Sequence, residues 1–278
     1  MRIVSLLPAA TEIVCALGLR DSLVGRSHEC DFPEDVAALP PLTRSHIDST
    51  LSGREIDEQV RRAVREGRPL YELDEERLSA LAPDVVVTQA ACEVCAIGEG
   101  QVGDAQRRCA PRATLVSLHP TRLDEVLDDA RTVARACGVA EAGETLVSGL
   151  RARLARVRRA GAMDRPRVAL IEWLDPPMLA GHWVPDMIEA AGGAPLGPLP
   201  GARFASVTWE DVARLRPDAL VVAPCGFDLE RTIEAARPWS DRLDAIAPRV
   251  LLLDGNAYVN RPGPRVVDAV EQIAAWLG

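Results

Sequence analysis

Short runs of consecutive apolar residues recur along the chain and alternate with segments of helical spacing. The runs with strand character lie at 3–7, 23–25, 84–88, 114–118, 167–174, 219–223 and 249–255. Apolar residues at successive positions are typical of parallel strands that are buried on both faces of a sheet. Segments in which apolar residues return every three or four positions lie at 11–19, 123–138, 141–162 and 184–193. The pattern predicts an α/β fold with parallel sheets.

Two stretches from opposite halves of the chain resemble each other. ERLSALAPDVVVTQAAC at 76–92 and EDVARLRPDALVVAPC at 210–225 each combine an acidic start, a helical stretch, a Pro-Asp pair, an apolar run and a cysteine. We therefore expect two lobes of similar plan, at 1–120 and 165–278. A helical linker at 121–164 should join them, and it should contain one long helix within about 140–161.

The composition excludes some classes of partner and does not by itself indicate a function. The chain has 278 residues, 47% of them hydrophobic and 26% charged, with a net charge of −9. The excess of acidic residues argues against nucleic acid or an anionic membrane as a partner, and no apolar run reaches the ~20 residues of a membrane span. No secretory signal pattern precedes the first strand, so the sequence as written predicts a cytoplasmic protein. A periplasmic or extracellular location would require that a signal had been removed.

Several motifs, taken in order, resemble a known family. VSLLPAATEIVCALGL at 4–19, LVGRSHECDFP at 23–33, LAPDVVV at 81–87 and LDGNAYVNRPGPRVVDAVEQI at 253–273 are similar to the vitamin B12-binding, class III substrate-binding proteins of ABC importers. The resemblance implies two Rossmann-like lobes bridged by one long backbone helix, with the ligand in the cleft between them. It also implies a corrinoid (cobalamin or cobinamide) or another small-molecule metal chelate as the ligand. An ABC permease is the implied partner if the protein is exported.

The resemblance and the strand ends together indicate the residues that contact the ligand. In open α/β sheets, ligands bind beyond the carboxyl ends of the strands. The candidate contacts either match the family's first ligand-side loop or follow predicted strands: Pro8, Ala9, Thr11, Glu29, Tyr71, Trp173, His182, Trp183, Phe227, Asp228, Asp254, Asn256, Tyr258 and Arg261. Glu29 stands where a vitamin B12 binder carries an aromatic residue, which leaves room for a smaller corrinoid or a different chelate.

Glu76 and Glu210 occupy equivalent places in the internal repeat. The resemblance implies that each docks on an arginine of the permease, one from each lobe. As ordinary surface residues, they would only stabilise a helix start by ~0.5 kcal/mol.

Thiols form a second group of candidates for chemistry. The chain has seven cysteines, and we expect them to be reduced in a cytoplasmic protein. Those that follow predicted strands, with a neighbouring histidine, could hold zinc or an iron–sulfur cluster: Cys30, Cys92, Cys95, Cys225 and His28. The C-x-x-C pair of Cys92 and Cys95 is equally consistent with a redox dithiol or with plain loop packing. The remaining cysteines have helical apolar neighbours and should pack as small hydrophobes.

No catalytic triad, P-loop or dinucleotide fingerprint stands in a suitable context. Two classes of function therefore stay open. The first is a binding protein for a corrinoid or metal chelate. The second is a cytosolic metal- or iron–sulfur-dependent enzyme or sensor that uses a Cys/His/Glu cluster in the same cleft. The absence of a catalytic motif favours the binding protein.

Overall fold

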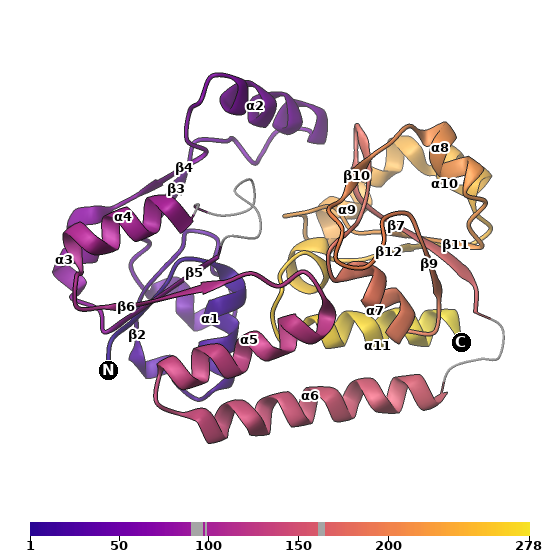
Figure 1. The fold of residues 1–278 in the computed structure, drawn as a ribbon. Helices are drawn as coiled ribbons and strands as arrows, with labels where there is room; N and C mark the ends of the chain where they lie inside the picture. The colour runs from indigo at the N-terminus through magenta and orange to yellow at the C-terminus, as the bar shows by residue number, and fades with distance from the viewer. Residues whose placement is uncertain (90–96, 98, 161–164) are drawn as a thin grey trace. The chain divides into compact units, whose positions relative to one another are not determined.

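A computed structural model describes residues 1–89, 97, 99–160 and 165–278 (Figure 1). The chain divides into two compact units, each built from three stretches. Unit 1 comprises Met1–Leu51, Glu58–His119 and Leu127–Gly149, and unit 2 comprises Ser52–Asp57, Pro120–Val126 and Leu150–Gly278. The lobe boundaries expected from the sequence, at 1–120, 121–164 and 165–278, stay a prediction.

Unit 1 contains a four-stranded parallel sheet with the order β2-β1-β5-β6. Its strands are β1 (Ile3–Ser5), β2 (Leu23–Arg26), β5 (Val85–Gln89) and β6 (Thr114–Leu118). The central strands β1 and β5 are buried at every position, as their unbroken apolar runs predict. A separate antiparallel pair, β3 (Thr43–Ser45) with β4 (Tyr71–Leu73), was not predicted from the sequence.

The helices in the first half of the chain pack on these strands or connect them. They are α1 (Pro8–Ala16), α2 (Gly53–Arg65), α3 (Glu75–Leu81), α4 (Glu99–Cys109) and α5 (Leu123–Ala136), with 3-10 turns η1 (Arg20–Ser22) and η2 (Glu34–Ala38). Both α2 and α5 are divided between the two units. Most of them bury an apolar stripe, but α2 buries only Ala63.

Unit 2 contains a six-stranded sheet centred on β7 (Arg167–Leu174). The other strands are β8 (Pro177–Leu179), β9 (Ala194–Leu196), β10 (Ala205–Ser206), β11 (Ala219–Val222) and β12 (Val250–Leu252). β7, β9, β11 and β12 run parallel, whereas β8 and β10 are antiparallel additions at one edge. β7, β11 and β12 were predicted from the sequence, whereas the short strands β8, β9 and β10 were not.

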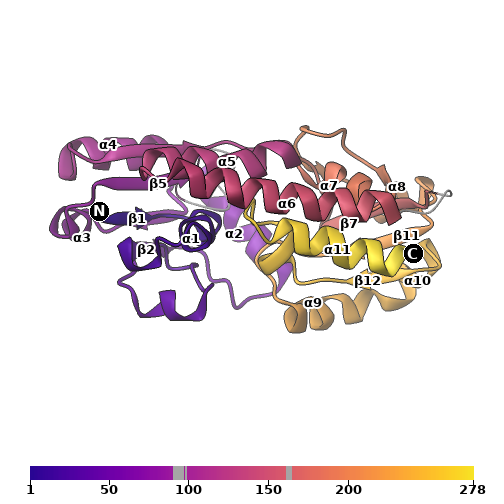
Figure 2. The same cartoon turned by 90° about the horizontal axis from the view of Figure 1, so that it is seen from below.

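The long helix expected within 140–161 is confirmed as α6 (Ala140–Ala160). It lies alongside the last helix of the chain, α11 (Val266–Leu277), in both views of the ribbon (Figures 1 and 2). Arg153 joins the two helices, because its guanidinium pairs with Asp268 and, at 2.9 Å from Nε, with Glu271. The remaining helical elements of unit 2 are α7 (Val184–Ala190), α8 (Trp209–Arg214), α9 (Leu229–Ala236), η3 (Arg237–Trp239), α10 (Ser240–Ile246) and the π-helical turn η4 (Gly255–Val259).

The internal repeat is visible as one turn that occurs twice. The carboxylate of Asp84 accepts a hydrogen bond from the backbone N–H of Arg2 at 2.7 Å, and Asp218 accepts one from Arg167 at the same distance. Each aspartate follows a short helix and a proline, and each fixes the start of the neighbouring strand. The α/β fold class predicted from the sequence is thereby confirmed in both units. None of the helices in the described ranges is long and apolar enough to cross a membrane.

Candidate functional site

A buried chain of hydroxyl and thiol groups shapes the carboxyl end of β1. The hydroxyl of Thr11 lies 2.8 Å from Ser5 Oγ and 3.0 Å from Cys30 Sγ, and Ser5 Oγ donates to the carbonyl of Leu7 at 3.0 Å. Residues 8–12, expected as a ligand-side turn, form the start of α1, and their side chains are buried. Pro8, Ala9 and Thr11 therefore hold the backbone at this strand end in place.

His28 and Tyr71 lie together near the end of β2. The two rings are 5.8 Å apart, and the Nδ1 atom of His28 is 2.7 Å from the hydroxyl of Thr43. Burial, and then the positive charge of Arg26, lower the pKa of His28 below its usual value. The imidazole is thus neutral near pH 7, which is the form that binds metal ions. The carboxylate of Glu29 lies 3.8 Å from the Nε2 atom of His28.

In unit 2, an aromatic and cationic stack lies at the ends of β7 and β11. The rings of Trp173 and Phe227 are 5.3 Å apart and inclined by 59°. The guanidinium carbon of Arg231 lies 3.7 Å from the centre of the Phe227 ring, which is a cation–π contact. Sequence reasoning found the two aromatic residues but missed Arg231. The spacing of four residues between Phe227 and Arg231 across a helix start could have indicated the contact.

The carboxylates that follow β11 and β12 cap the next helical elements. Asp228 accepts a hydrogen bond from the Arg231 N–H at 2.8 Å and begins α9, and Asp254 accepts one from the Ala257 N–H at 2.6 Å and begins η4. Burial raises the pKa of Asp254, and the negative charge of Asp228 adds to the effect, while Arg261 and other donors act against it. Asn256 and Tyr258, two further predicted contacts, lie within η4.

The loop before α7 is fixed by its backbone. His182 has a positive φ of 49°, and its N–H donates to the carbonyl of Ala202 at 2.6 Å. Burial lowers the pKa of the His182 imidazole, and Arg203 adds to this. Trp183 is buried, and its ring N–H donates to the carbonyl of Val259 at 2.9 Å. Trp183 thus connects two loops of unit 2, in addition to any role in ligand binding.

The predicted thiol site stays a prediction, because two of its cysteines, Cys92 and Cys95, lie outside the described residues. Cys30 is buried against Thr11, and Cys225 is half-buried, with its N–H donating to the carbonyl of Glu172 at 3.0 Å. Within the described part of the chain, no three His, Cys, Asp or Glu side chains are grouped so that they could hold a metal ion.

Glu76 and Glu210, the predicted docking residues, have the same local setting. Each lies in the first turn of a short helix, α3 or α8, whose start is capped by a side chain. Asp74 caps α3 through the Arg77 N–H, and Thr208 caps α8 through a reciprocal capping box. Glu210 is mostly exposed and lies 3.9 Å from Arg242.

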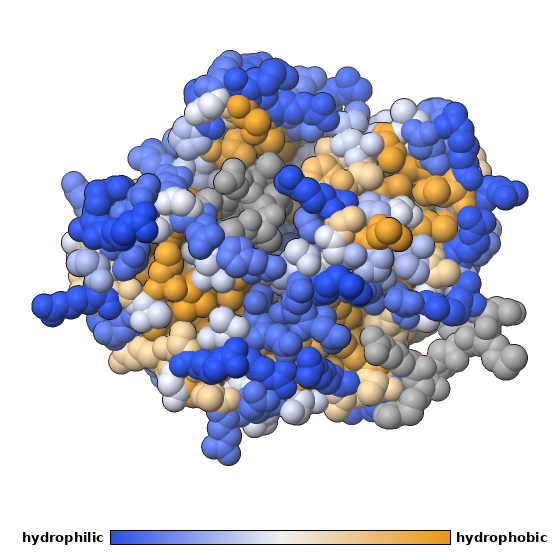
Figure 3. Space-filling model, in the orientation of Figure 1, coloured by the Kyte–Doolittle hydropathy of each residue, from blue (hydrophilic) through white to orange (hydrophobic). Residues whose placement is uncertain are grey.

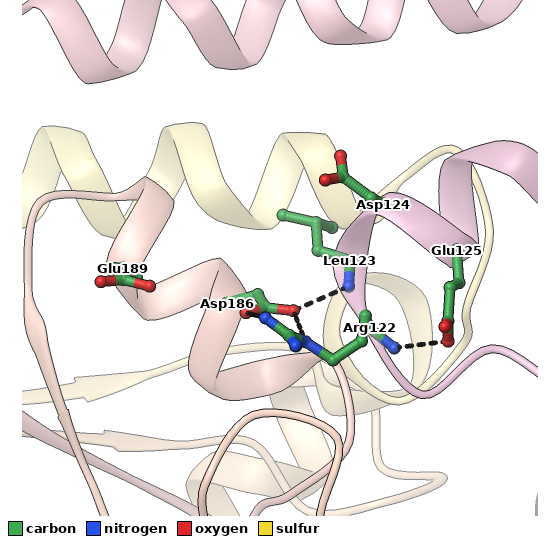
Figure 4. Close-up of a pocket in the computed structure, with 6 residues that line it drawn as sticks. All are labelled: Arg122, Leu123, Asp124, Glu125, Asp186 and Glu189. Carbon is green, nitrogen blue, oxygen red and sulfur yellow. Dashed lines mark hydrogen bonds and ion pairs between the residues drawn. The ribbon is translucent and has the colours of Figure 1, made fainter.

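A polar pocket of about 370 Å³ lies between the start of α5 and α7 (Figure 4). Its central feature is a two-point ion pair from Arg122 to Asp186, at 2.8 and 2.9 Å. Asp186 also accepts from the Leu123 N–H, and Glu125 accepts from the N–H groups of Thr121 and Arg122. The carboxylates therefore hold the start of α5 in place, and we assign the pocket no ligand.

The fold and the strand-end residues define a two-lobed α/β binding protein, and comparison with known families agrees. The periplasmic binding protein family matches residues 3–249, so the chain belongs to this family. It is 24% identical to the vitamin B12-binding protein of Vibrio cholerae over 286 residues, which cover 99% of this chain and 88% of the relative. The resemblance predicted from the sequence is confirmed.

Solved structures show the same fold. The crystal structure of the periplasmic vitamin B12 binding protein of Vibrio cholerae matches with a TM-score of 0.72 at 24% identity, covering 99% of this chain and 96% of that one. A periplasmic heme-binding protein from Pseudomonas aeruginosa matches with a TM-score of 0.72 at 20% identity, covering 99% and 91%. Proteins named for two different metal chelates thus share this fold.

Proposed function

We propose that the chain is the substrate-binding protein of an ABC importer and that its ligand is a metal-chelate tetrapyrrole. Membership of the periplasmic binding protein family supports the general role. The half-buried indole of Trp173, which packs against the buried ring of Phe227 at the strand ends of unit 2, supports the ligand class, because a flat macrocycle stacks on aromatic rings. His28 and Tyr71, at the strand ends of unit 1, are the further contacts that we propose.

A corrinoid is the first candidate, because relatives that match 99% of this chain at 22–24% identity are named as vitamin B12-binding proteins. Heme is the second candidate, for a reason found in this chain. Arg231 and Arg265 follow β11 and β12 in the chain, and guanidinium groups pair with carboxylates such as heme propionates. Cobinamide carries amides at its rim and would gain less from these arginines.

Calorimetric titration with cyanocobalamin, cobinamide and hemin tests the proposal. We expect heat with at least one chelate, accompanied by quenching of tryptophan fluorescence. Trp173→Ala should weaken that binding by about 2- to 10-fold, the contribution of one aromatic contact. Trp276→Ala is the matched control, because this indole lies on α11 against Arg249. The absence of heat with all three chelates would overturn the proposed ligand class.

The zinc or iron–sulfur alternative draws on Cys30, Cys92, Cys95, Cys225 and His28. Cys92 and Cys95 lie outside the described residues, and nothing among the described residues favours the alternative. Elemental analysis of protein purified without oxygen checks it directly. We further propose Glu76 and Glu210 as docking residues for the permease. The location of the protein stays a prediction, and fractionation of the native cells distinguishes a cytoplasmic chain from an exported one.

A further inference from the structure

The first turn of α2 covers one side of the Trp173 indole. A methyl group placed on Gly53 would lie 3.5 Å from Cζ2 and 3.6 Å from Cε2 of Trp173, an ordinary van der Waals contact, so the helix backbone passes the ring at the distance of one methyl group. Trp173 belongs to the stack that supports the proposed ligand. Part of the surface that a macrocycle would use is therefore occupied by the protein's own chain.

An ion pair holds this turn in place. Arg54 Nε lies 3.0 Å from Asp175 Oδ2, and Arg54 Nη2 lies 3.2 Å from Asp175 Oδ1. The Trp173 ring N–H donates to the carbonyl of the same aspartate at 3.2 Å. Asp175 thus joins the indole to the residue that fastens the helix start above it.

The ion pair is weak enough to open. The Arg54 side chain is 67% exposed and that of Asp175 is 28% exposed. An exposed pair of this kind changes an equilibrium by only about 1.4- to 5-fold, and salt screens it. The position of Arg54 lowers the barrier further, because a cation in the first turn of a helix is opposed by the helix dipole.

The helix start keeps its own shape without Asp175. The N–H and the hydroxyl of Ser52 both donate to the carboxylate of Glu55, at 3.0 and 2.6 Å, and the Glu55 N–H is 3.4 Å from Ser52 Oγ. This reciprocal cap fixes the turn internally. α2 buries only Ala63, and Val60 packs partly buried against the same core, so the buried apolar contact of the helix lies in its second half and not in its first turn. Figure 3 accordingly shows mostly hydrophilic residues over α2.

We propose that the first turn of α2, Ser52–Asp57, is a displaceable cover over Trp173, and that the Arg54–Asp175 pair controls how readily a ligand reaches the indole. The proposal rests on the proposed function for the identity of its ligand. The division of α2 agrees with it, since Ser52–Asp57 packs with unit 2 whereas Glu58–Arg65 packs with unit 1.

The cover is tested first without any ligand. Acrylamide quenching of Trp173 is obtained as the difference between each protein and its Trp173→Phe counterpart. Arg54→Gln and Asp175→Asn should each raise the quenching constant by about 1.4- to 5-fold, and the double variant should add nothing, because both changes remove one interaction. Arg122→Gln breaks a similar two-point pair elsewhere in unit 2 and should leave Trp173 unchanged. Quenching in Arg54→Gln and Asp175→Asn equal to that in Arg122→Gln overturns the proposal.

Stopped-flow binding of hemin and cobinamide tests the control of access. The association rate should rise in Arg54→Gln and Asp175→Asn by the same factor as the quenching, and high salt should raise it in the unsubstituted protein only. If calorimetry shows binding but these rates are unchanged, the cover proposal fails while the proposed function stands. If the variants expose Trp173 and calorimetry gives no heat with cyanocobalamin, cobinamide or hemin, the ligand assignment fails, and with it the role of the cover in access.

Discussion

At the residue scale, one half-buried histidine in each unit has a pKa shifted in the same direction. His28 at the end of β2 and His182 before α7 both have pKa values lowered by burial, and each has an arginine nearby that adds to the effect. Both imidazoles are therefore neutral at neutral pH. The unfolded chain binds protons at these residues more readily than the folded chain, so acid favours unfolding.

We predict that the free energy of unfolding decreases as the pH falls through the usual histidine pKa of 6.5. The sign follows from the lowered pKa values, because the stability is present above 6.5 and is lost as the histidines become protonated. His28→Gln should flatten this decrease between about pH 7 and pH 5, and His182→Gln should flatten it independently. Urea unfolding across this range measures the effect. The same slope in both variants and in the unsubstituted protein would contradict the prediction.

The residues of the candidate site could be predicted only in part from the sequence. Trp173 lies at the end of one apolar run, and Phe227 and Asp228 follow another, so strand-end reasoning placed them together, and the structure does bring them together in unit 2. Arg54 could not be found in this way, because 121 residues separate it from Asp175. The cap roles of Asp228 and Asp254 were also missed, since a cap depends on where a helix begins.

At the element scale, the turn between α3 and β5 and the turn between α8 and β11 share a strained backbone conformation. Ala82 and Arg216 occupy equivalent places with φ values of 41° and 48°, in the left-handed region. Glycine adopts this region freely, whereas other residues pay about 1 kcal/mol. The sequence repeat indicated both turns but not their conformation, because neither position carries the glycine that usually marks it.

We predict that Ala82→Gly stabilises the protein by about 0.5 kcal/mol, since relief of the left-handed strain exceeds the added entropy of the unfolded chain. Ala80→Gly is the matched control. Ala80 is an exposed residue within α3, where glycine should cost about 0.5–1 kcal/mol. Thermal unfolding of the two variants should therefore shift in opposite directions. A loss of stability in both would show that the turn is not strained.

At the scale of the whole molecule, the sequence predicted the parallel sheets and the long helix well. Both follow from apolar runs and helical spacing that local sequence encodes. The division of α2 and α5 between two units was not predictable, because it depends on packing between distant stretches. The proposed docking on a permease also involves the whole molecule, because Glu76 and Glu210 lie in different units at equivalent helix starts.

We predict that the double variant Glu76→Gln/Glu210→Gln binds the permease at least about tenfold more weakly, because interfacial charge pairs of this kind are lost. Ligand affinity measured by calorimetry should not change. The double variant Glu141→Gln/Asp241→Asn is the control, because it removes one first-turn carboxylate from each unit at other helices. Binding to permease in nanodiscs measures the difference. Equal weakening in the two double variants would argue against specific docking.

Because each unit is built from three separate stretches of the chain, few crossovers between related genes would keep both units intact. The chain passes from one unit to the other just before and within α2, just before and within α5, and within α6. A chimera with a relative that joins the two genes at a single point would combine parts of both parents inside one unit. Transfer of ligand specificity between relatives should therefore require exchange of Ser52–Asp57 and Pro120–Val126 together with the C-terminal stretch. Homologous exchange at one crossover would produce units whose interior surfaces had not evolved together.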